Sequence, residues 1–337
     1  MSNRLKYLVF VVLISLVAFT PKDDFVFEVP NGWPQPKYTF KTNAVTEAKF
    51  KLGRQLFYDP VLSADSTISC ASCHLQATGF AHTDHTVSHG IQGRIGTRNA
   101  PALVNLAWSS SFMWDGGVNH LDVQALAPLT SPDEMGESLK NVVKKLRKSP
   151  NYTSMFKEAY GSEIVTGERI LKALSVFNIM LVSSNSEYDK VMQGKEHFTE
   201  QEANGYKIFK HNCAVCHTEP LFTNDAFENN GITTDEYYKD YGRMKVTRNV
   251  RDSLKFKVPT LRNVEFTYPY MHDGRYKKLM AVMNHYSALD KNSAILSEKL
   301  KSMQILSDED KIDLIAFLKT LTDKDFLYNT QFSFPKE

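Results

Sequence analysis

Cysteine is scarce in this chain and is confined to two places. Only four of the 337 residues are cysteines, and all four belong to two copies of the pattern Cys-x-x-Cys-His, at residues 70–74 and 213–217. No cysteine is left over for the framework of structural disulfides that small secreted domains use. No cysteine follows the N-terminal apolar run either, which excludes a lipoprotein anchor.

The chain also lacks an excess of charge of one sign. Its formal net charge is +2, and no long run of like charges occurs. Near-neutrality argues against a nucleic-acid-binding protein, which would show a basic excess. It gives no guide to the charge of a partner. Alternating strand patterns are scarce as well, so the sequence predicts a mostly helical protein.

The two Cys-x-x-Cys-His motifs predict two covalently attached c-type haems, one in each half of the chain. Two thiols bond to the haem, and the adjacent histidine reaches the iron as proximal ligand. A thioredoxin-like pair, half of a zinc site or a local disulfide would use the same cysteines. Those alternatives explain neither the repeat nor the histidine after each pair. The candidate haem-binding residues are Cys70, Cys73, His74, Cys213, Cys216 and His217.

The N-terminal residues resemble a secretory signal. Arg4 and Lys6 precede an apolar run over residues 7–19, so we expect a signal peptide over residues 1–20. The run is short for a bilayer span. Ala18 is the only small residue well placed for cleavage, which leaves an uncleaved anchor open. Export to the periplasm agrees with c-haem attachment, which bacteria carry out outside the cytoplasmic membrane.

The helical patterns predict two all-α, cytochrome c-like domains. A Pro-rich extended lead-in over residues 21–43 precedes an N-terminal domain over 44–186, and a C-terminal domain with its tail covers 187–337. Thr199 and Ser307 begin capping boxes. The last helix is expected to bury Ile312, Ile315, Leu318 and Leu321 on one face. The other helices are expected at residues 44–57, 121–127, 137–148, 152–160, 168–182 and 277–286.

Several blocks around the motifs resemble the bacterial dihaem cytochrome c peroxidase family, which includes the methylamine-utilisation protein MauG. Together they extend over most of the chain, from about Lys49 to Tyr286. The blocks are Leu-Gly-Arg-Gln-Leu-Phe-Tyr-Asp-Pro at 52–60, Ile-Ser at 68–69, Thr-Arg-Asn-Ala-Pro at 97–101, Phe-Met-Trp-Asp-Gly at 112–116, Val-Pro-Thr-Leu-Arg-Asn-Val at 258–264 and Tyr-Pro-Tyr-Met-His-Asp-Gly at 268–274.

The resemblance implies roles for several residues. Peroxide would bind at the haem held by His74, and the haem held by His217 would store or relay an electron. Trp114 would lie between the haems. The remaining implied roles are a polar pair over the peroxide-binding face, Gln124 and Glu134, and a calcium site at Asn99 and the carbonyls around Thr267 and Pro269.

Each of these residues also has an ordinary structural interpretation. Glu134 follows a proline and would suit the N-terminal dipole of a helix. Gln124 would be a surface helix residue, and Trp114 would belong to the core. A carboxylate in a haem pocket, with its pKa raised by burial, would instead move a proton between the two peroxide oxygens.

Two positions depart from the peroxidase pattern. Tyr286 occupies the place of the methionine that is the second axial ligand in well-studied peroxidases, and MauG has tyrosine there; Met280 and Met283 are the alternative ligands. In peroxidases that need reductive activation, a histidine blocks the first iron. His89 is the obvious candidate, but an ungapped alignment puts Ile91 at that place. The sequence therefore predicts a first haem that is permanently accessible.

Three functions follow. The first is a periplasmic enzyme that reduces hydrogen peroxide with electrons from a small donor protein of the cytochrome c or cupredoxin type. The second is a MauG-like enzyme that uses peroxide to oxidise a protein or organic substrate through a high-valent state. The third is a dihaem electron carrier, which would need no proton-handling group. Members of the family are often dimers, although nothing in this sequence indicates one.

Overall fold

A computed structural model describes residues 25–234 and 236–335 of the protein. The first half contains α1 (Glu47–Tyr58), α2 (Cys70–Cys73), α3 (Leu121–Gln124), α4 (Leu126–Thr130), α5 (Leu139–Arg147), α6 (Pro150–Tyr160) and α7 (Gly167–Met180). The second contains α8 (Glu187–Met192), α9 (Glu200–Asn212), β1 (Phe227–Glu228), α10 (Met244–Thr247), β2 (Phe256–Lys257), α11 (Leu279–Ser287), α12 (Glu298–Lys301), α13 (Asp308–Lys319) and α14 (Lys324–Leu327). Short 3₁₀ turns lie at Phe40–Thr42, Pro60–Leu62, Gln76–Thr78, Ile91–Gly93, Leu106–Trp108 and Val250–Asp252.

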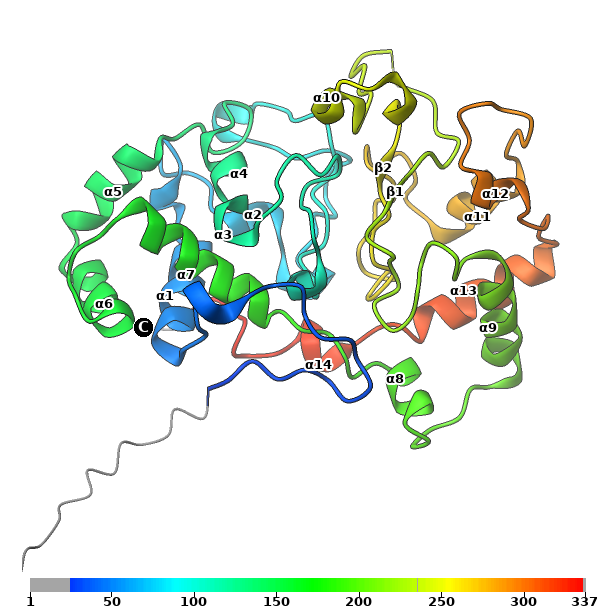
Figure 1. Cartoon of the computed structure of the whole chain (residues 1–337), viewed down its shortest axis with the longest axis horizontal. Coiled ribbons are helices and arrows are strands. Elements are labelled where there is room, and N and C mark those ends of the chain that lie inside the picture. The colour runs from blue at the N-terminus through cyan, green and yellow to red at the C-terminus, as the bar shows by residue number, and fades with distance from the viewer. Residues whose placement is uncertain (1–24, 235, 336–337) are drawn as a thin grey trace, which may run out of the picture.

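The two halves form two helical lobes that lie side by side (Figure 1). Each lobe is built on the crossing of two helices at a glycine. In the first lobe, a Cβ on Gly53 of α1 would lie 2.0 Å from the carbonyl oxygen of Ala173 in α7. In the second, a Cβ on Gly205 of α9 would lie 1.9 Å from the carbonyl oxygen of Asp313 in α13. Only glycine permits backbones to approach this closely, so both lobes use the same packing device.

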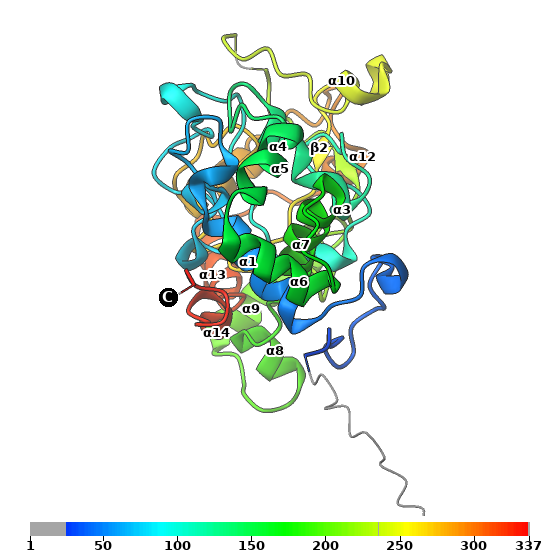
Figure 2. The same cartoon turned by 90° about the vertical axis from the view of Figure 1, so that its left-hand side faces the viewer.

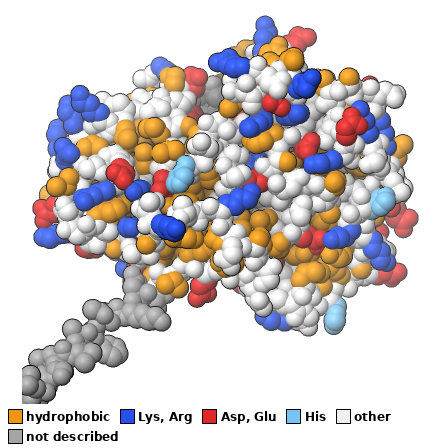
Figure 3. Space-filling view, in the orientation of Figure 1, with side chains coloured by type: hydrophobic (Ala, Val, Ile, Leu, Met, Phe, Trp, Pro, Cys, Tyr) orange, Lys and Arg blue, Asp and Glu red, His pale blue; other side chains and the backbone are white. Residues whose placement is uncertain are grey.

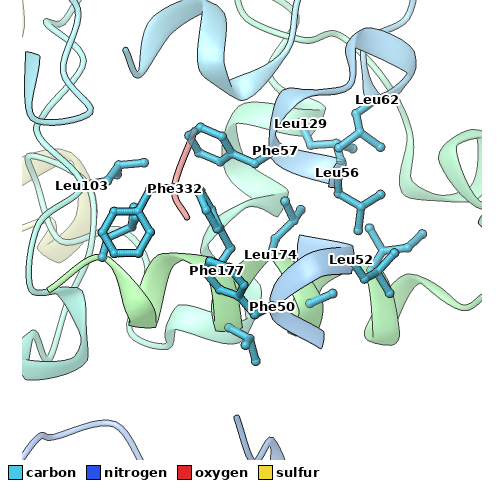
Figure 4. Packing of buried hydrophobic residues seen from close by; sticks show 14 of the residues in the cluster. Phe50, Leu52, Leu56, Phe57, Leu62, Leu103, Leu129, Leu174, Phe177 and Phe332 are labelled. Atoms are coloured by element: carbon cyan, nitrogen blue, oxygen red, sulfur yellow. The ribbon is translucent and has the colours of Figure 1, made fainter. Parts of the chain in front are cut away.

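Aromatic side chains fill the core of each lobe. In the first, Phe57 and Phe177 have ring centroids 4.9 Å apart (Figure 4). In the second, Phe209 and Phe317 have ring centroids 5.0 Å apart. Burial of such a side chain stabilises the fold by about 1.5–3 kcal/mol. Two separate cores confirm the expected pair of helical, cytochrome c-like domains.

The end of the described chain packs on the first lobe. Phe326, in α14, and Phe332 belong to the first core. Tyr58 donates a hydrogen bond to the Phe332 carbonyl at 2.8 Å. Figures 1 and 2 show α14 returning from the second lobe to the underside of the first. The domain limits therefore stay a prediction, and the tail ties the two lobes together.

Long irregular segments face one another between the helix pairs. Residues 59–114 of the first lobe and 218–270 of the second are mostly loops. In the described part of the chain the second segment carries the only sheet, in which β1 and β2 pair antiparallel over two residues each. Loop segments can present side chains in many directions, and these two segments supply most of the candidate site.

The sequence predicted where two helices begin more accurately than it predicted which face of the last helix is buried. The capping boxes at Thr199 and Ser307 are confirmed. The expected face of α13 was wrong in part, because Ile312 is 50% exposed while Leu314 and Phe317 are buried. The expected helix at 121–127 continues as α4 to Thr130.

The expected signal peptide over residues 1–20 lies outside the described residues. Among the residues that the structure does describe, none of the helices is both long and apolar enough to cross a membrane.

Candidate active site

A cavity of about 960 Å³ is lined by residues of both lobes. Both Cys-x-x-Cys-His motifs reach its wall, although they are 139 positions or more apart in the sequence. The candidate site residues on the wall are Cys70, Cys73, His74, Asn99, Trp114, Gln124, Glu134, Cys213, Cys216, His217, Thr267, Pro269 and Tyr286. The fold thus gathers every candidate residue of the sequence around one space.

The first motif has the chemistry that a c-type haem needs. Cys70 and Cys73 are free thiols on the one-turn helix α2. The His74 ring is hydrogen-bonded through Nδ1 to the Phe80 carbonyl at 2.7 Å, which leaves Nε2 as the nitrogen that can bind a metal. Burial lowers the pKa of His74 to about 4, so the imidazole is neutral at pH 7, as a metal ligand must be.

The second motif repeats this arrangement. Cys213 and Cys216 are free thiols after the end of α9. The Nδ1 atom of His217 lies 3.1 Å from the carbonyl oxygens of both Phe222 and Pro259, and burial lowers the pKa of His217 to about 4. The two neutral imidazoles, each held through Nδ1 beside a pair of thiols, fit two covalent haems.

Glu134 is associated with the first motif. It lines the cavity, and burial and the nearby charge of Asp133 raise its pKa. Burial raises the pKa of the Cys70 thiol to about 12, and the charge of Glu134 adds to that rise. Glu134 does not begin a helix, since α5 starts at Leu139 with Ser138 as its cap. The interpretation of Glu134 as a helix-entry acid is therefore wrong.

The backbone of Glu134 is held by the loop that precedes Asn99. The Ile91 amide donates a hydrogen bond to the Glu134 carbonyl at 2.9 Å. The Ile91 side chain is buried and lies so close to Gly136 that a Cβ there would come within 2.6 Å of Ile91 Cδ1. The His89 ring packs against His85, with centroids 3.9 Å apart, and the His89 carbonyl accepts a hydrogen bond from Cys73 Sγ at 3.5 Å.

Gln124 and Trp114 are oriented by their neighbours. Gln124 Nε2 lies 3.6 Å from Met113 Sδ, and Gln124 is only partly exposed on the cavity wall. Trp114 Nε1 donates to the Asn99 carbonyl at 2.8 Å, and the Trp114 carbonyl accepts from the Lys257 amide at 2.7 Å. Trp114 therefore lies where the two lobes meet.

Tyr286 is associated with the second motif. It lies on α11 and lines the cavity. Burial raises the pKa of Tyr286 to about 12, and the nearby thiols of Cys213 and Cys216 contribute to the rise. Of the two alternative ligands, Met280 is 36% exposed, whereas Met283 is buried and reaches the cavity. Met283 therefore stays the competing ligand.

Sequence reasoning missed Asn230. It lies close to the side chain of Tyr286, where its amide opposes the rise in the tyrosine pKa. Its amide donates to Met271 Sδ at 3.4 Å, and its carbonyl lies 2.9 Å from His285 Nε2. Asn230 lies in an irregular loop, where no periodic pattern marks it.

Arg98 was also overlooked, although the quoted Thr-Arg-Asn-Ala-Pro block contains it. Its guanidinium bridges Asp115 at 2.7 Å and Asp240 at 2.6 and 2.9 Å. Burial alone would raise the pKa of Asp240, but Arg98 and its other partners hold it well below its usual range. Arg98 thus ties the segment after Trp114 to the second lobe.

The candidate calcium residues all line the cavity. Asn99 donates from Nδ2 to the Thr86 carbonyl at 3.1 Å, which leaves its side-chain oxygen to face other partners. Thr267 and Pro269 line the same cavity. Within the described ranges, no three His, Cys, Asp or Glu side chains cluster as a metal site. A calcium ion here would depend on amide and carbonyl oxygens, which are ligands that suit it.

Comparison with known proteins identifies the family. Residues 47–197 match the model of the di-haem cytochrome c peroxidases, and residues 202–322 match that of cytochrome c. The chain is 36% identical to the methylamine utilization protein MauG of Methylorubrum extorquens over 88% of this chain and 83% of the other. The chain belongs to the di-haem cytochrome c peroxidase and MauG family. The predicted family and the two c-type haems are thereby confirmed.

Two further relatives show the range within this di-haem peroxidase family. The cytochrome c551 peroxidase of Nitrosomonas europaea is 35% identical over 81% of this chain and 79% of its own length. The crystal structure of a MauG-like protein associated with microbial copper homeostasis superposes with a TM-score of 0.85, at 32% identity, over 92% of this chain and 99% of that one. The chain is therefore an oxidoreductase of the cytochrome c peroxidase type.

Proposed function

We propose that this protein is an exported dihaem enzyme that reduces hydrogen peroxide to water with electrons from a small redox protein. The observation that carries the proposal is Glu134, a half-buried carboxyl with a raised pKa on the wall beside the first motif. The basic residues and apolar run before residue 20 support export to the periplasm.

The chain's own residues would hold the reactants and move the protons. His74 and His217 would bind the two irons through Nε2, and the haems would supply the O–O cleavage site and relay the electrons of the donor protein. Reduction of one peroxide consumes two electrons and two protons and releases two waters. Glu134 would take the proton from the inner peroxide oxygen and return it to the outer one, which becomes water. Gln124 would hold the peroxide by its amide.

Electron transfer between the two haems would pass by Trp114. Trp114 is fixed by hydrogen bonds to both lobes on the wall that the two motifs share. An aromatic ring in that position would shorten the path by which an electron passes from the second site to the first. Asn99, Thr267 and Pro269 would hold calcium beside it, which would stiffen the same junction.

One observation favours a second candidate function. Tyr286 of α11 lies near both cysteines of the second motif. Tyrosinate stabilises oxidised iron, whereas methionine raises the reduction potential. A second site of this kind suits a MauG-like enzyme that oxidises a protein or organic substrate.

The test is steady-state peroxide consumption by the holoenzyme with a reduced small cytochrome c. We expect Glu134→Gln to lower the rate by about 10²- to 10⁴-fold, the range that general acid–base groups contribute. Glu158→Gln, a matched change on the exposed face of α6, should leave the rate unchanged. Peroxide reaction without donor turnover would favour the MauG-like function. Full activity of Glu134→Gln would contradict the proposal.

A further inference from the structure

A basic projection lies over the junction of the two lobes. It comprises residues 239–257, from the loop before α10 through β2, and we call it the α10 lobe. Figure 1 shows α10 at the top of the molecule, and Figure 3 shows Lys and Arg side chains gathered there.

The α10 lobe concentrates charge that the whole chain does not show. It contains seven Lys or Arg and two Asp, whereas the net charge of the chain is only +2. Both aspartates are engaged, Asp240 with Arg98 and Lys245, and Asp252 with Lys255. The exposed cations Lys239, Arg248 and Arg251 have no acidic partner within the described residues. The surface is therefore positive where it meets solvent.

Exposed apolar side chains lie among these cations. Val250 is 77% exposed, Val246 is 42% exposed and Tyr241 is 41% exposed. A small apolar centre with a charged rim is the usual composition of a transient protein interface. The rim charges of such an interface steer encounter and select partners of opposite charge.

The α10 lobe is fixed to the segment that contains Trp114 and Asp115. Arg243 donates from Nη1 to the Asp115 carbonyl at 3.0 Å, and its guanidinium lies 3.8 Å from the ring centroid of Phe227. The Lys257 amide donates to the Trp114 carbonyl, and Lys245 reaches the cavity wall. A protein that docks on the lobe would therefore lie directly over Trp114 and Asp115.

We propose that the α10 lobe is the docking surface for an acidic redox protein that delivers electrons one at a time. This inference rests on the proposed function, and it names the charge of the donor. A second copy of the chain fits the lobe poorly, because a symmetric contact would bring like charges together. An anionic lipid surface would use the cations but would not explain the link to Trp114.

The experiment measures binding of the fully haem-loaded protein by titration calorimetry without peroxide. The probes are an acidic cupredoxin, a basic cytochrome c and vesicles that contain phosphatidylglycerol. The test variant is Arg248→Glu with Arg251→Glu. The matched control is Lys140→Glu with Lys144→Glu on α5, which makes the same change in net charge. The apolar residues Val142 and Leu146 of that helix are buried, so α5 carries cations without the exposed apolar centre.

We expect the acidic cupredoxin to bind the wild-type protein. In the test variant the Kd of this complex should rise by about tenfold or more, because rim charges govern such encounters. The control should stay within about twofold, and higher salt should weaken the wild-type complex. Peroxide reduction with a small dye as donor should be unchanged in the test variant. If the wild-type protein does not reduce peroxide with the dye as donor, that result contradicts the proposed function and not the docking surface.

Four results would overturn the docking proposal. In the first, the acidic cupredoxin does not bind. In the second, the control variant weakens its binding as much as the test variant does, and in the third, the basic cytochrome c binds more tightly than the acidic cupredoxin. In the fourth, the protein binds the vesicles but not the acidic cupredoxin, and the test variant abolishes vesicle binding.

Discussion

At the scale of single residues, we propose that Glu134 and Tyr286 make the two haem sites unequal. The charge of Glu134 contributes to the raised pKa values of the Cys70 and Cys73 thiols. The thiols of the second motif contribute in the same way to the raised pKa of Tyr286. In this proposal one site would have a proton-handling group, and the other would have a side chain that closes the iron. The motifs alone could not predict this difference, because the two are almost identical in sequence.

The ligand role of Tyr286 has a direct test. We expect Tyr286→Met to raise the reduction potential of the second haem, because methionine favours ferrous iron more than tyrosinate does. The measurement is a spectroscopic redox titration of the holoenzyme. Tyr276→Phe is the control, since this nearby tyrosine hydrogen-bonds to His285 at 3.3 Å and has no proposed ligand role. If Met283→Leu alters the potential and Tyr286→Phe does not, Met283 is the ligand.

At the scale of helices, the glycine crossings set how closely the elements pack. We expect Gly205→Ala to destabilise the protein by about 3 kcal/mol or more, because the new Cβ would meet the backbone of Asp313 at 1.9 Å and no flexible group can move away. Lys207→Ala, an exposed change on the same helix, is the control. The measurement is chemical unfolding followed by circular dichroism. Equal stability of the two variants would show that α9 and α13 are not held this closely.

Asp225 joins three segments of the chain. It binds Lys37 of the lead-in at 2.8 Å, the amide of Ser110 at 2.7 Å, and Lys257 in β2. Burial alone would raise its pKa, but the charge and hydrogen bond of Lys257, with help from Lys37 and Ser110, lower it to about 2. The unfolded chain should titrate near the ordinary value of about 3.9.

A folded-state pKa below the unfolded value gives stability that is present above about pH 4 and is lost as pH falls toward 2. The contribution of Asp225 is on the order of 1–2 kcal/mol, since burial lowers the pKa of Lys257 and offsets part of the gain. We expect Asp225→Asn to be less stable at pH 6 and to show a shallower loss of Tm between pH 4.5 and pH 2.5. Parallel Tm curves for the two proteins would contradict this role.

The sequence could predict helix starts better than buried faces. Capping boxes are local patterns, so Thr199 and Ser307 could be identified without the fold. The buried face of α13 depends on which neighbour it meets, and the crossing with α9 at Gly205 turns Leu314 and Phe317 inward instead of Ile312. Gly205 within the helix pattern did not by itself indicate a helix crossing. Its role becomes visible only when the two backbones are seen together.

At the scale of the whole molecule, the fold creates properties that composition conceals. A net charge of +2 gave no guide to partners, yet the α10 lobe gathers cations on one projection. The haem-binding residues could be suggested from the two motifs, and the other candidate site residues from the family resemblance. The roles of Arg98 and Asn230 could not, because they depend on contacts between distant loops. The cavity that unites both motifs is likewise a product of the assembled lobes.

The central claim is that the first iron is open beneath Glu134 while the second is closed by a side chain. Electron paramagnetic resonance of the fully ferric holoenzyme, before any reductant is added, tests this most directly. We expect one high-spin and one low-spin haem signal in comparable amounts, and the same spectrum for His89→Ala. Two low-spin signals in the wild type, with a high-spin signal appearing only after half-reduction or in His89→Ala, would contradict the claim.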